Sequence, residues 1–271
     1  MVLFLAECFA TCIMILIGEG AIANYKFTQE PSQTTLPIAI AFGVGVYAAL
    51  MLAAPIAGAQ LNPALSISLL TIGEIKPLLC LLYVIAQVVG AFLGAVLVYV
   101  VYVKQFDAYD GGRREMIGVT GTADVFFTMP AEGIPNWSAF IDQVIGTGIL
   151  MIFVQAVGNK SNQITSKVIQ PFAYALIVIG IISAFSINAG AAVNPARDFG
   201  PRIFGAFIYG WKAVFTVHDY YFWVPIVGPI VGAIIGVWVY QCYRFIVKKY
   251  GYLSNVEAPS IDIEQRVSSK F

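Results

Sequence analysis

The chain has 271 residues, of which 59% are hydrophobic and 11% are charged, and its formal net charge is zero. Its mean hydropathy of +0.81 leaves too little polar surface for a soluble domain, and several apolar stretches approach the ~20 residues that cross a bilayer. A balanced charge and a pI near 6.6 give no indication of nucleic-acid binding. The composition therefore predicts an all-α protein with several membrane spans.

The apolar stretches fall into six full spans and two shorter pieces. The full spans are expected at residues 3–23, 36–55, 78–103, 140–157, 168–187 and 222–247. The shorter pieces, 65–72 and 203–209, each lie between the second and third span of one half of the chain. A helix of about a dozen residues covers only ~18 Å of a hydrocarbon layer ~30 Å thick, so both are predicted to be half-helices.

Each half-helix follows the same tripeptide, which occurs as Asn62-Pro63-Ala64 and again as Asn194-Pro195-Ala196. Asparagine is a strong N-cap, and proline fits the first turn of a helix, where its missing N–H costs nothing. Broken helices at membrane depth are tolerated where their backbone lines a cavity. Their corresponding positions in the two halves predict a solute path near the middle of the membrane.

The chain divides into two repeats, residues 1–137 and 138–250, followed by a polar tail, 251–271, that is expected to be flexible and cytoplasmic. Each repeat has three full spans, an odd number, so the second repeat must enter the membrane from the opposite side. The half-helices then meet by their N-termini. Gly90 and Gly94 correspond to Gly232 and Gly236, and this spacing allows close helix packing either within one chain or between subunits.

These motifs resemble the aquaporin superfamily over nearly the whole chain, from Glu7 to about Tyr243. Asp198 and Arg202, which follow the second tripeptide, resemble the glycerol-conducting branch. The resemblance implies an aquaporin-like right-handed bundle that passes glycerol and water through a lipid bilayer while excluding protons and ions, with urea and other small neutral solutes as further candidates. It also implies a homotetramer without cofactors, in the plasma membrane, with both termini cytoplasmic.

Asn62 and Asn194 each stand at the positive end of a helix. Their amides can donate hydrogen bonds to a passing hydroxyl, while the paired helix dipoles repel cations and protons. The small-residue segments before them are expected to present a ladder of carbonyl acceptors, formed by Gly58, Ala59, Gln60, Gly190, Ala191 and Ala192. Gln60 stands where most family members have histidine.

By the resemblance, Arg197 is the arginine of a selectivity filter, and the motif spacing places the other filter positions at Phe42, Ile182 and Ala191. The alternative is a structural ion pair between Arg197 and Asp198. The bacterial glycerol facilitator has tryptophan in place of Phe42, and glycine and phenylalanine in place of Ile182 and Ala191. These differences leave the width of the filter undetermined by the sequence.

Buried polar residues have structural interpretations as well. The counterpart of Glu7 in the family holds the loop before a half-helix, and a proton relay is the alternative. Gln143 replaces the glutamate usual in the second half, although its amide can still accept backbone N–H bonds. Glu19 and Asp142 are placed near the ends of their spans. The sequon at Asn136 is interpreted as a chance match.

Other classes of function remain as alternatives: a secondary transporter, a structural junction protein or a water-selective channel. Few ionisable residues lie inside the spans, which disfavours ion coupling. An enzyme is not expected, because no nucleophile, base or metal cluster recurs in phase. The cysteines have no metal-binding spacing and are interpreted as buried thiols; they are Cys8, Cys12, Cys80 and Cys242.

Overall fold

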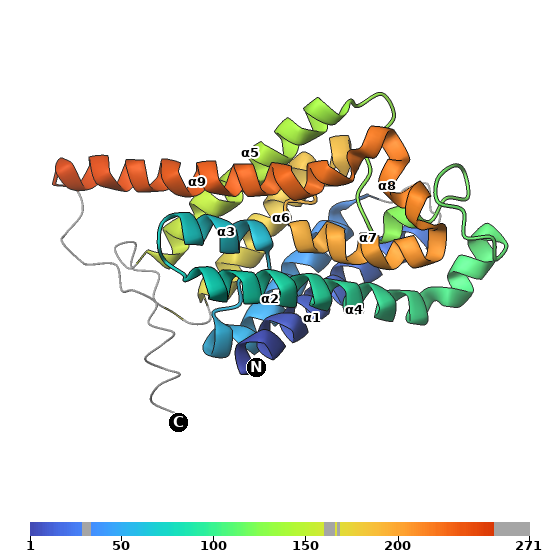
Figure 1. Cartoon of the computed structure of the whole chain (residues 1–271), viewed down its shortest axis with the longest axis horizontal. Helices are drawn as coiled ribbons and strands as arrows, with labels where there is room; N and C mark the ends of the chain where they lie inside the picture. The colour runs from blue at the N-terminus through green and yellow to red at the C-terminus, as the bar shows by residue number, and fades with distance from the viewer. Residues whose placement is uncertain (29–33, 160–165, 167–168, 252–271) are drawn as a thin grey trace.

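The protein is a bundle of helices (Figure 1). The computed structural model describes residues 1–28, 34–159, 166 and 169–251, so the predicted tail lies, apart from Gly251, outside the described residues. The helices are α1 Val2–Thr28, α2 Leu36–Ala57, α3 Pro63–Thr71, α4 Pro77–Asp110, α5 Asn136–Gly158, α6 Ile169–Ala189, α7 Pro195–Tyr209, α8 Trp211–Tyr220 and α9 Val224–Lys249. Two short 3₁₀ segments, η1 Ala123–Val125 and η3 Tyr221–Trp223, complete them.

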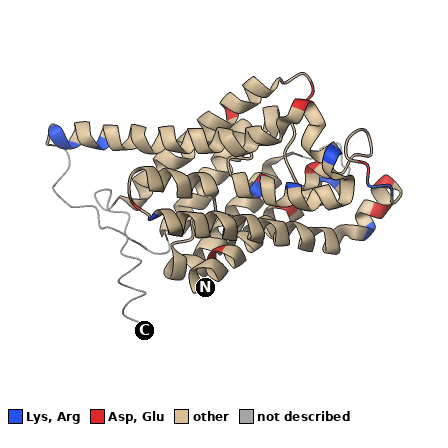
Figure 2. Cartoon of the chain, in the orientation of Figure 1, with Lys and Arg blue, Asp and Glu red and all other residues tan. Residues whose placement is uncertain are grey.

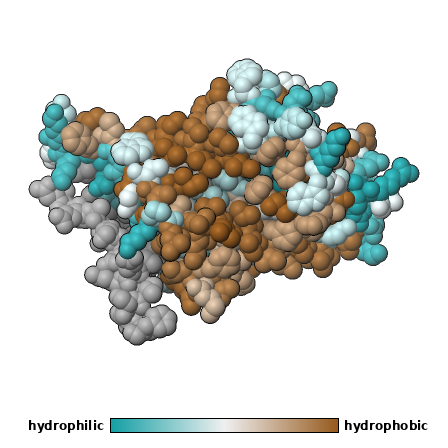
Figure 3. Space-filling model, in the orientation of Figure 1, coloured by the Kyte–Doolittle hydropathy of each residue, from teal (hydrophilic) through white to brown (hydrophobic). Residues whose placement is uncertain are grey.

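The six predicted spans are confirmed as α1, α2, α4, α5, α6 and the helical segment that ends in α9. Charged residues concentrate toward the two ends of the bundle, and apolar side chains cover its middle (Figures 2 and 3). Between residues 81 and 97 of α4 the exposed side chains recur at every fourth residue and are all large and apolar: Leu81, Ile85, Val89, Leu93 and Leu97. Such a surface suits lipid rather than water, so the chain is a multi-pass membrane protein.

The predicted half-helices are confirmed as α3, with 9 residues, and α7, with 15 residues. At 1.5 Å per residue they are only about 14 and 22 Å long, too short to cross the hydrocarbon layer. Both begin at the proline of a tripeptide, and the asparagine before it has an extended backbone with φ of −152°. The order α1, α2, α3, α4 is repeated as α5, α6, α7, α9, whereas the exact boundaries of the repeats stay a prediction.

The glycine spacing that the two halves share serves packing within the chain. A Cβ atom at Gly90 would lie 2.2 Å from the carbonyl oxygen of Cys8, so α4 lies directly against α1. The same holds for the equivalent pair α5 and α9, where a Cβ atom at Gly232 would lie 2.3 Å from the carbonyl oxygen of Val144. Of the two interpretations left open by the sequence, the structure supports contact within the chain at these positions.

The segment after α4 differs from the prediction. Helix α4 continues to Asp110, seven residues past the expected end, and the residues that follow fold back into the protein. Phe126 and Phe127 are fully buried, and the ring of Phe126 stacks on that of Phe106 with centroids 5.5 Å apart. Helix α8 was not predicted either. These elements are held by contacts between residues that are far apart in the sequence. The hydrophobic periodicity of a local stretch does not predict such contacts.

One cysteine prediction was wrong. Cys8, Cys12 and Cys80 are buried, but Cys242 is exposed on α9. Its helix lies at one edge of the bundle and extends beyond its neighbours (Figure 1). An apolar stretch in a membrane helix has a lipid-facing side as well as a core side, so hydrophobic neighbours alone do not predict burial inside the protein.

Candidate solute pore

The two asparagines of the tripeptides bind each other's loops at the centre of the bundle. Asn62 Nδ2 donates to the carbonyl oxygen of Val193 at 2.9 Å, and Asn194 Nδ2 donates to that of Leu61 at 2.8 Å. Their Oδ1 atoms cap the half-helices by accepting from the backbone N–H of Ala64 and of Ala196. An amide nitrogen carries two hydrogens, so within the described part of the chain each asparagine keeps one N–H for a solute.

Buried side chains hold the loops before the half-helices. Glu7 accepts from the backbone N–H of Gln60 at 2.6 Å and from that of Leu61 at 3.0 Å. In the second half, Gln143 Oε1 accepts from the backbone N–H of Val193 at 2.9 Å. The amide oxygen of Gln143 thus holds the second loop by one bond, where the carboxylate of Glu7 holds the first loop by two. Both side chains bind the backbone just before an asparagine.

The same loops have an unusual backbone. Gly58 and Gly190 have φ of 81° and 73°, and the alanines that follow, Ala59 and Ala191, have φ of 50° and 44°. Left-handed conformations are uncommon outside glycine and cost free energy, which the bonds from Glu7 and Gln143 help to offset. All the residues predicted to form the carbonyl ladder line one cavity: Gly58, Ala59, Gln60, Gly190, Ala191 and Ala192.

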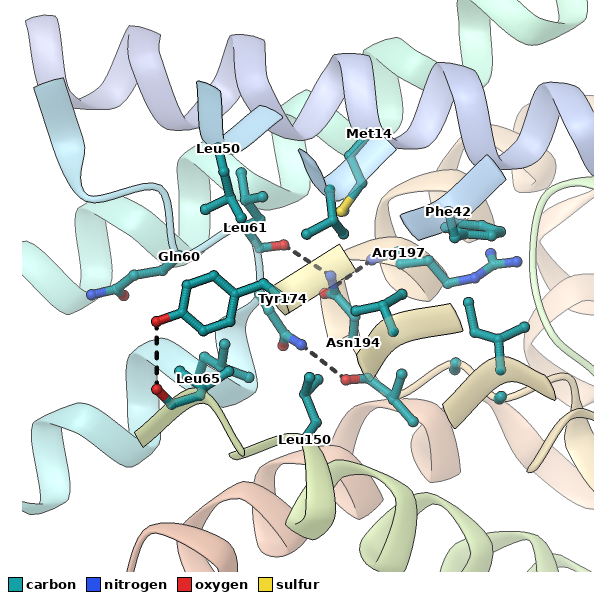
Figure 4. Close-up of a pocket in the computed structure, with 18 of the residues that line it drawn as sticks. Met14, Phe42, Leu50, Gln60, Leu61, Leu65, Leu150, Tyr174, Asn194 and Arg197 are labelled. Carbon is teal, nitrogen blue, oxygen red and sulfur yellow. Dashed lines mark hydrogen bonds between the residues drawn. The ribbon is translucent and has the colours of Figure 1, made fainter. Parts of the chain in front are cut away.

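That cavity has a volume of about 850 Å³ and continues through the bundle. Its lining includes Tyr25 and Thr35 at one end and Glu74 and Arg244 at the other. Near the asparagines the wall is mostly apolar, and Figure 4 shows side chains there that point toward the hollow, among them Met14, Leu50, Leu65 and Leu150. A polar line of amides and carbonyls thus faces an apolar wall.

The four predicted filter residues, Phe42, Ile182, Ala191 and Arg197, line the same cavity. The Arg197 guanidinium carbon lies 5.0 Å from the centre of the Phe42 ring, close enough for a cation–π interaction. Nη1 of Arg197 donates to the carbonyl oxygen of Phe126 at 3.0 Å. One edge of the guanidinium is held by the protein, and Arg197 is only 6% exposed.

The ion pair between Arg197 and Asp198, the alternative raised by the sequence, is not among the described contacts. Asp198 instead pairs with Arg202, one helical turn later, with Nε of Arg202 2.6 Å from Oδ1. Both side chains are fully buried. Asp198 Oδ2 also accepts from the backbone N–H and the hydroxyl of Thr128, at 2.8 and 2.6 Å. Asp198 and Arg202 therefore fasten the segment between α4 and α5, which carries Phe126, onto α7.

Sequence reasoning missed two partners of Arg197. The first is the carbonyl of Phe126, which lies between the third and fourth predicted spans. The second is Glu19, which was placed near a span end but is fully buried in the interior of α1, with Oε1 3.4 Å from Nη1 of Arg197. The signal for this buried contact in the sequence was an acidic residue within an apolar stretch. Position along one helix does not reveal which residue of another helix it faces.

The opposite mouth of the cavity has its own polar group. Glu74, in the turn between α3 and α4, lines it together with Gln155 and Arg244. Burial raises the pKa of Glu74, while a hydrogen bond with Gln155 and the charge of Arg244 act in the opposite direction. This mouth therefore carries an acidic and a basic side chain, and the described residues contain no group of side chains that could hold a metal ion.

Six spans, two half-helices that meet by their N-termini and a cavity that passes between them define a membrane protein of the channel class. The model of the family "Major intrinsic protein" matches residues 2–240. The chain is 36% identical to aquaporin-9 of Homo sapiens over 237 residues, which are 87% of the chain and 80% of that protein. It is 33% identical to aquaglyceroporin-2 of Rhizophagus irregularis over 87% of the chain and 75% of that protein.

A solved structure supports the same family as these relatives. The crystal structure of the aquaglyceroporin from Plasmodium falciparum matches with a TM-score of 0.83 at 28% identity, over 92% of the chain and 98% of that structure. The chain belongs to the major intrinsic protein family.

Proposed function

We propose that the protein is a passive channel for glycerol and water that excludes protons and other ions. The observation that carries this proposal is the pair Asn62 and Asn194: both line a mostly apolar cavity, and each donates one of its two amide hydrogens to a carbonyl of the opposite loop, which leaves the other for a solute. A polyol exchanges its hydrogen bonds with water for bonds with amides and carbonyls, while its carbons contact the apolar wall. Because no site binds tightly, the solute can leave again.

The exclusion of ions follows from the same geometry. The N-termini of α3 and α7 meet at the asparagines, and each carries a partial positive charge of roughly +0.5. The two caps fix the asparagine oxygens on the helices, so the free groups that face the lumen there are donors. A hydrated proton or a metal cation meets the positive ends of two helices at this point and is repelled. The filter roles of Phe42, Ile182, Ala191 and Arg197 belong to this proposal.

The orientation and assembly also belong to the proposal. The N-terminus of α1 and the C-terminus of α9 lie at the same end of the bundle (Figure 1), which is compatible with two cytoplasmic termini in the plasma membrane. The continuous apolar surface of α4 suits either lipid or neighbouring subunits of a homotetramer. Small neutral solutes such as urea are further candidates for transport.

Stopped-flow measurements on proteoliposomes test the function. We expect vesicles with the protein to recover volume in a glycerol gradient much faster than empty vesicles, and to shrink faster in sucrose. The rates should depend weakly on temperature and not at all on a sodium or proton gradient. Flux that needs such a gradient would identify a secondary transporter, water flux without glycerol flux a water-selective channel, and no flux at all a structural protein.

A further inference from the structure

A second charge stands directly behind the filter arginine. Glu19 is fully buried on α1, and its Oε1 lies 3.4 Å from Nη1 of Arg197. Its other oxygen, Oε2, is buried as well and has no hydrogen-bond partner among the described residues. Arg197 lines the cavity, whereas Glu19 lies outside the described lining. The carboxylate therefore acts on a solute through Arg197 and not by contact.

The surrounding charges are already paired. Asp198, next to Arg197 in the chain, is bound by Arg202 and Thr128, as described above. Lys26 binds Asp124 at 2.9 Å at the outer mouth of the cavity. Glu19 is thus the described carboxylate that contacts Arg197. A buried charge is costly unless an opposite charge compensates it, so each member of this pair stabilises the charged form of the other.

We propose that Glu19 is the counter-charge of Arg197: it positions the guanidinium and sets the sign of the charge that ions meet at the constriction. This inference rests on the proposed channel function. The ion pair leaves Arg197 as a hydrogen-bond donor for hydroxyl groups while cancelling most of its net charge. The filter then favours neutral polar solutes over anions, which an uncompensated arginine would attract.

The inference predicts opposite effects from removing each partner. In Arg197→Val, the carboxylate of Glu19 is left bare beside the lumen, so cations are attracted and leak. In Glu19→Gln, the shape of the side chain is kept but Arg197 is uncompensated, so the leak should select anions. In the double variant Arg197→Val with Glu19→Gln, neither charge remains. Its cation leak should be at least about tenfold smaller than that of Arg197→Val alone, because a unit charge close to the path is removed.

Reversal potentials in planar bilayers under a KCl gradient measure the sign and size of each leak. A matched control is Arg197→Val with Asp124→Asn, which also loses one carboxylate, but an exposed one at the mouth that does not contact Arg197. Its cation leak should stay close to that of Arg197→Val, because exposed charges are screened. Gel filtration and water flux on the same preparations establish that each variant is folded.

The outcomes separate the inference from its alternatives. Equal cation leaks in Arg197→Val and its double variant with Glu19→Gln would overturn it, as would a cation-selective leak in Glu19→Gln or no leak in Arg197→Val. If Glu19→Gln alone does not fold, the comparison of the two Arg197→Val backgrounds decides. Glycerol flux through the unaltered protein tests the channel function independently of the sign of any leak.

Discussion

Ile182 is the filter residue with the clearest steric consequence. Its branched side chain and the small Ala191 line the same cavity, and both are almost fully buried. In Ile182→Gly, the three-carbon solute should gain more than water, because a larger solute is hindered sooner by each methyl group. We expect the ratio of glycerol to water permeability, measured by stopped flow, to increase several-fold.

The control for this variant is Ile187→Gly on the same helix. Ile187 is 85% exposed and lies outside the described lining, so the change introduces the same helix-weakening glycine without widening the path. Its permeability ratio should equal that of the unaltered protein. An unchanged ratio in Ile182→Gly would mean that the constriction lies elsewhere along the cavity.

The resemblance and its motif spacing pointed to four filter residues on three helices and one loop, and all four line one cavity. They did not reveal Glu19. An acidic residue inside an apolar span signals a buried interaction, but its partner comes from α7, almost 180 positions later. Such a pairing is a property of the folded bundle and not of any one helix.

At the scale of elements, a buried carboxylate fastens the segment between α4 and α5 to α7. Asp198 accepts hydrogen bonds from Thr128 and binds Arg202, whose guanidinium also lies over the Phe127 ring at 4.3 Å. In Asp198→Asn, Arg202 stays buried without a full counter-charge, and breaking such pairs costs about 3–5 kcal/mol. We expect a clearly lower melting temperature in detergent and a lower preference for glycerol, because the segment that carries Phe126 is loosened.

A surface ion pair provides the comparison. Lys104, which is 90% exposed, lies 3.4 Å from Asp107 on the same helix. Lys104→Ala should change the free energy of unfolding by less than about 1 kcal/mol, because exposed pairs contribute little. If Asp198→Asn were equally mild, the pair with Arg202 would not be what fastens that segment.

Contact between α5 and α9 is the second element-scale prediction. A Cβ atom at Gly232 would lie 2.3 Å from a backbone oxygen of α5, and a backbone cannot turn aside as a side chain can. Gly232→Val should therefore push the helices apart and cost roughly 1–3 kcal/mol or more, seen as a loss of thermal stability. Gly180→Ala on α6, where a Cβ atom meets open space, should be neutral or slightly stabilising.

The sequence predicted the full spans well because each is a long apolar run, and the half-helices because each is a short apolar run that follows a capping asparagine. It failed for the segment between α4 and α5 and for α8. At this outer corner Asn136 donates to the carbonyls of His218 and Asp219, two residues with positive φ that bend α8. These contacts engage the side-chain nitrogen of the sequon, and they join parts of the chain more than 80 residues apart.

At the scale of the whole molecule, the solute path of an assembly can run either through each subunit or between the subunits. Both asparagines, the four predicted filter residues and both mouths of the cavity come from one chain. In the proposed homotetramer, each subunit should then conduct independently, unlike a channel in which subunits share a central pore. Ile182→Trp places a large ring at the predicted constriction and should block one subunit without affecting its neighbours.

Mixed tetramers of unaltered and Ile182→Trp subunits distinguish the two arrangements. When the subunits are mixed in equal amounts, independent pores should keep about half of the glycerol flux, whereas a shared pore closed by any one blocked subunit would keep about one sixteenth. The flux should fall in a straight line as the blocked fraction rises, because each functional cavity is complete in itself. A steep, curved loss would place the path at the subunit interface, and the cavity between α3 and α7 would then not be the route of the solute.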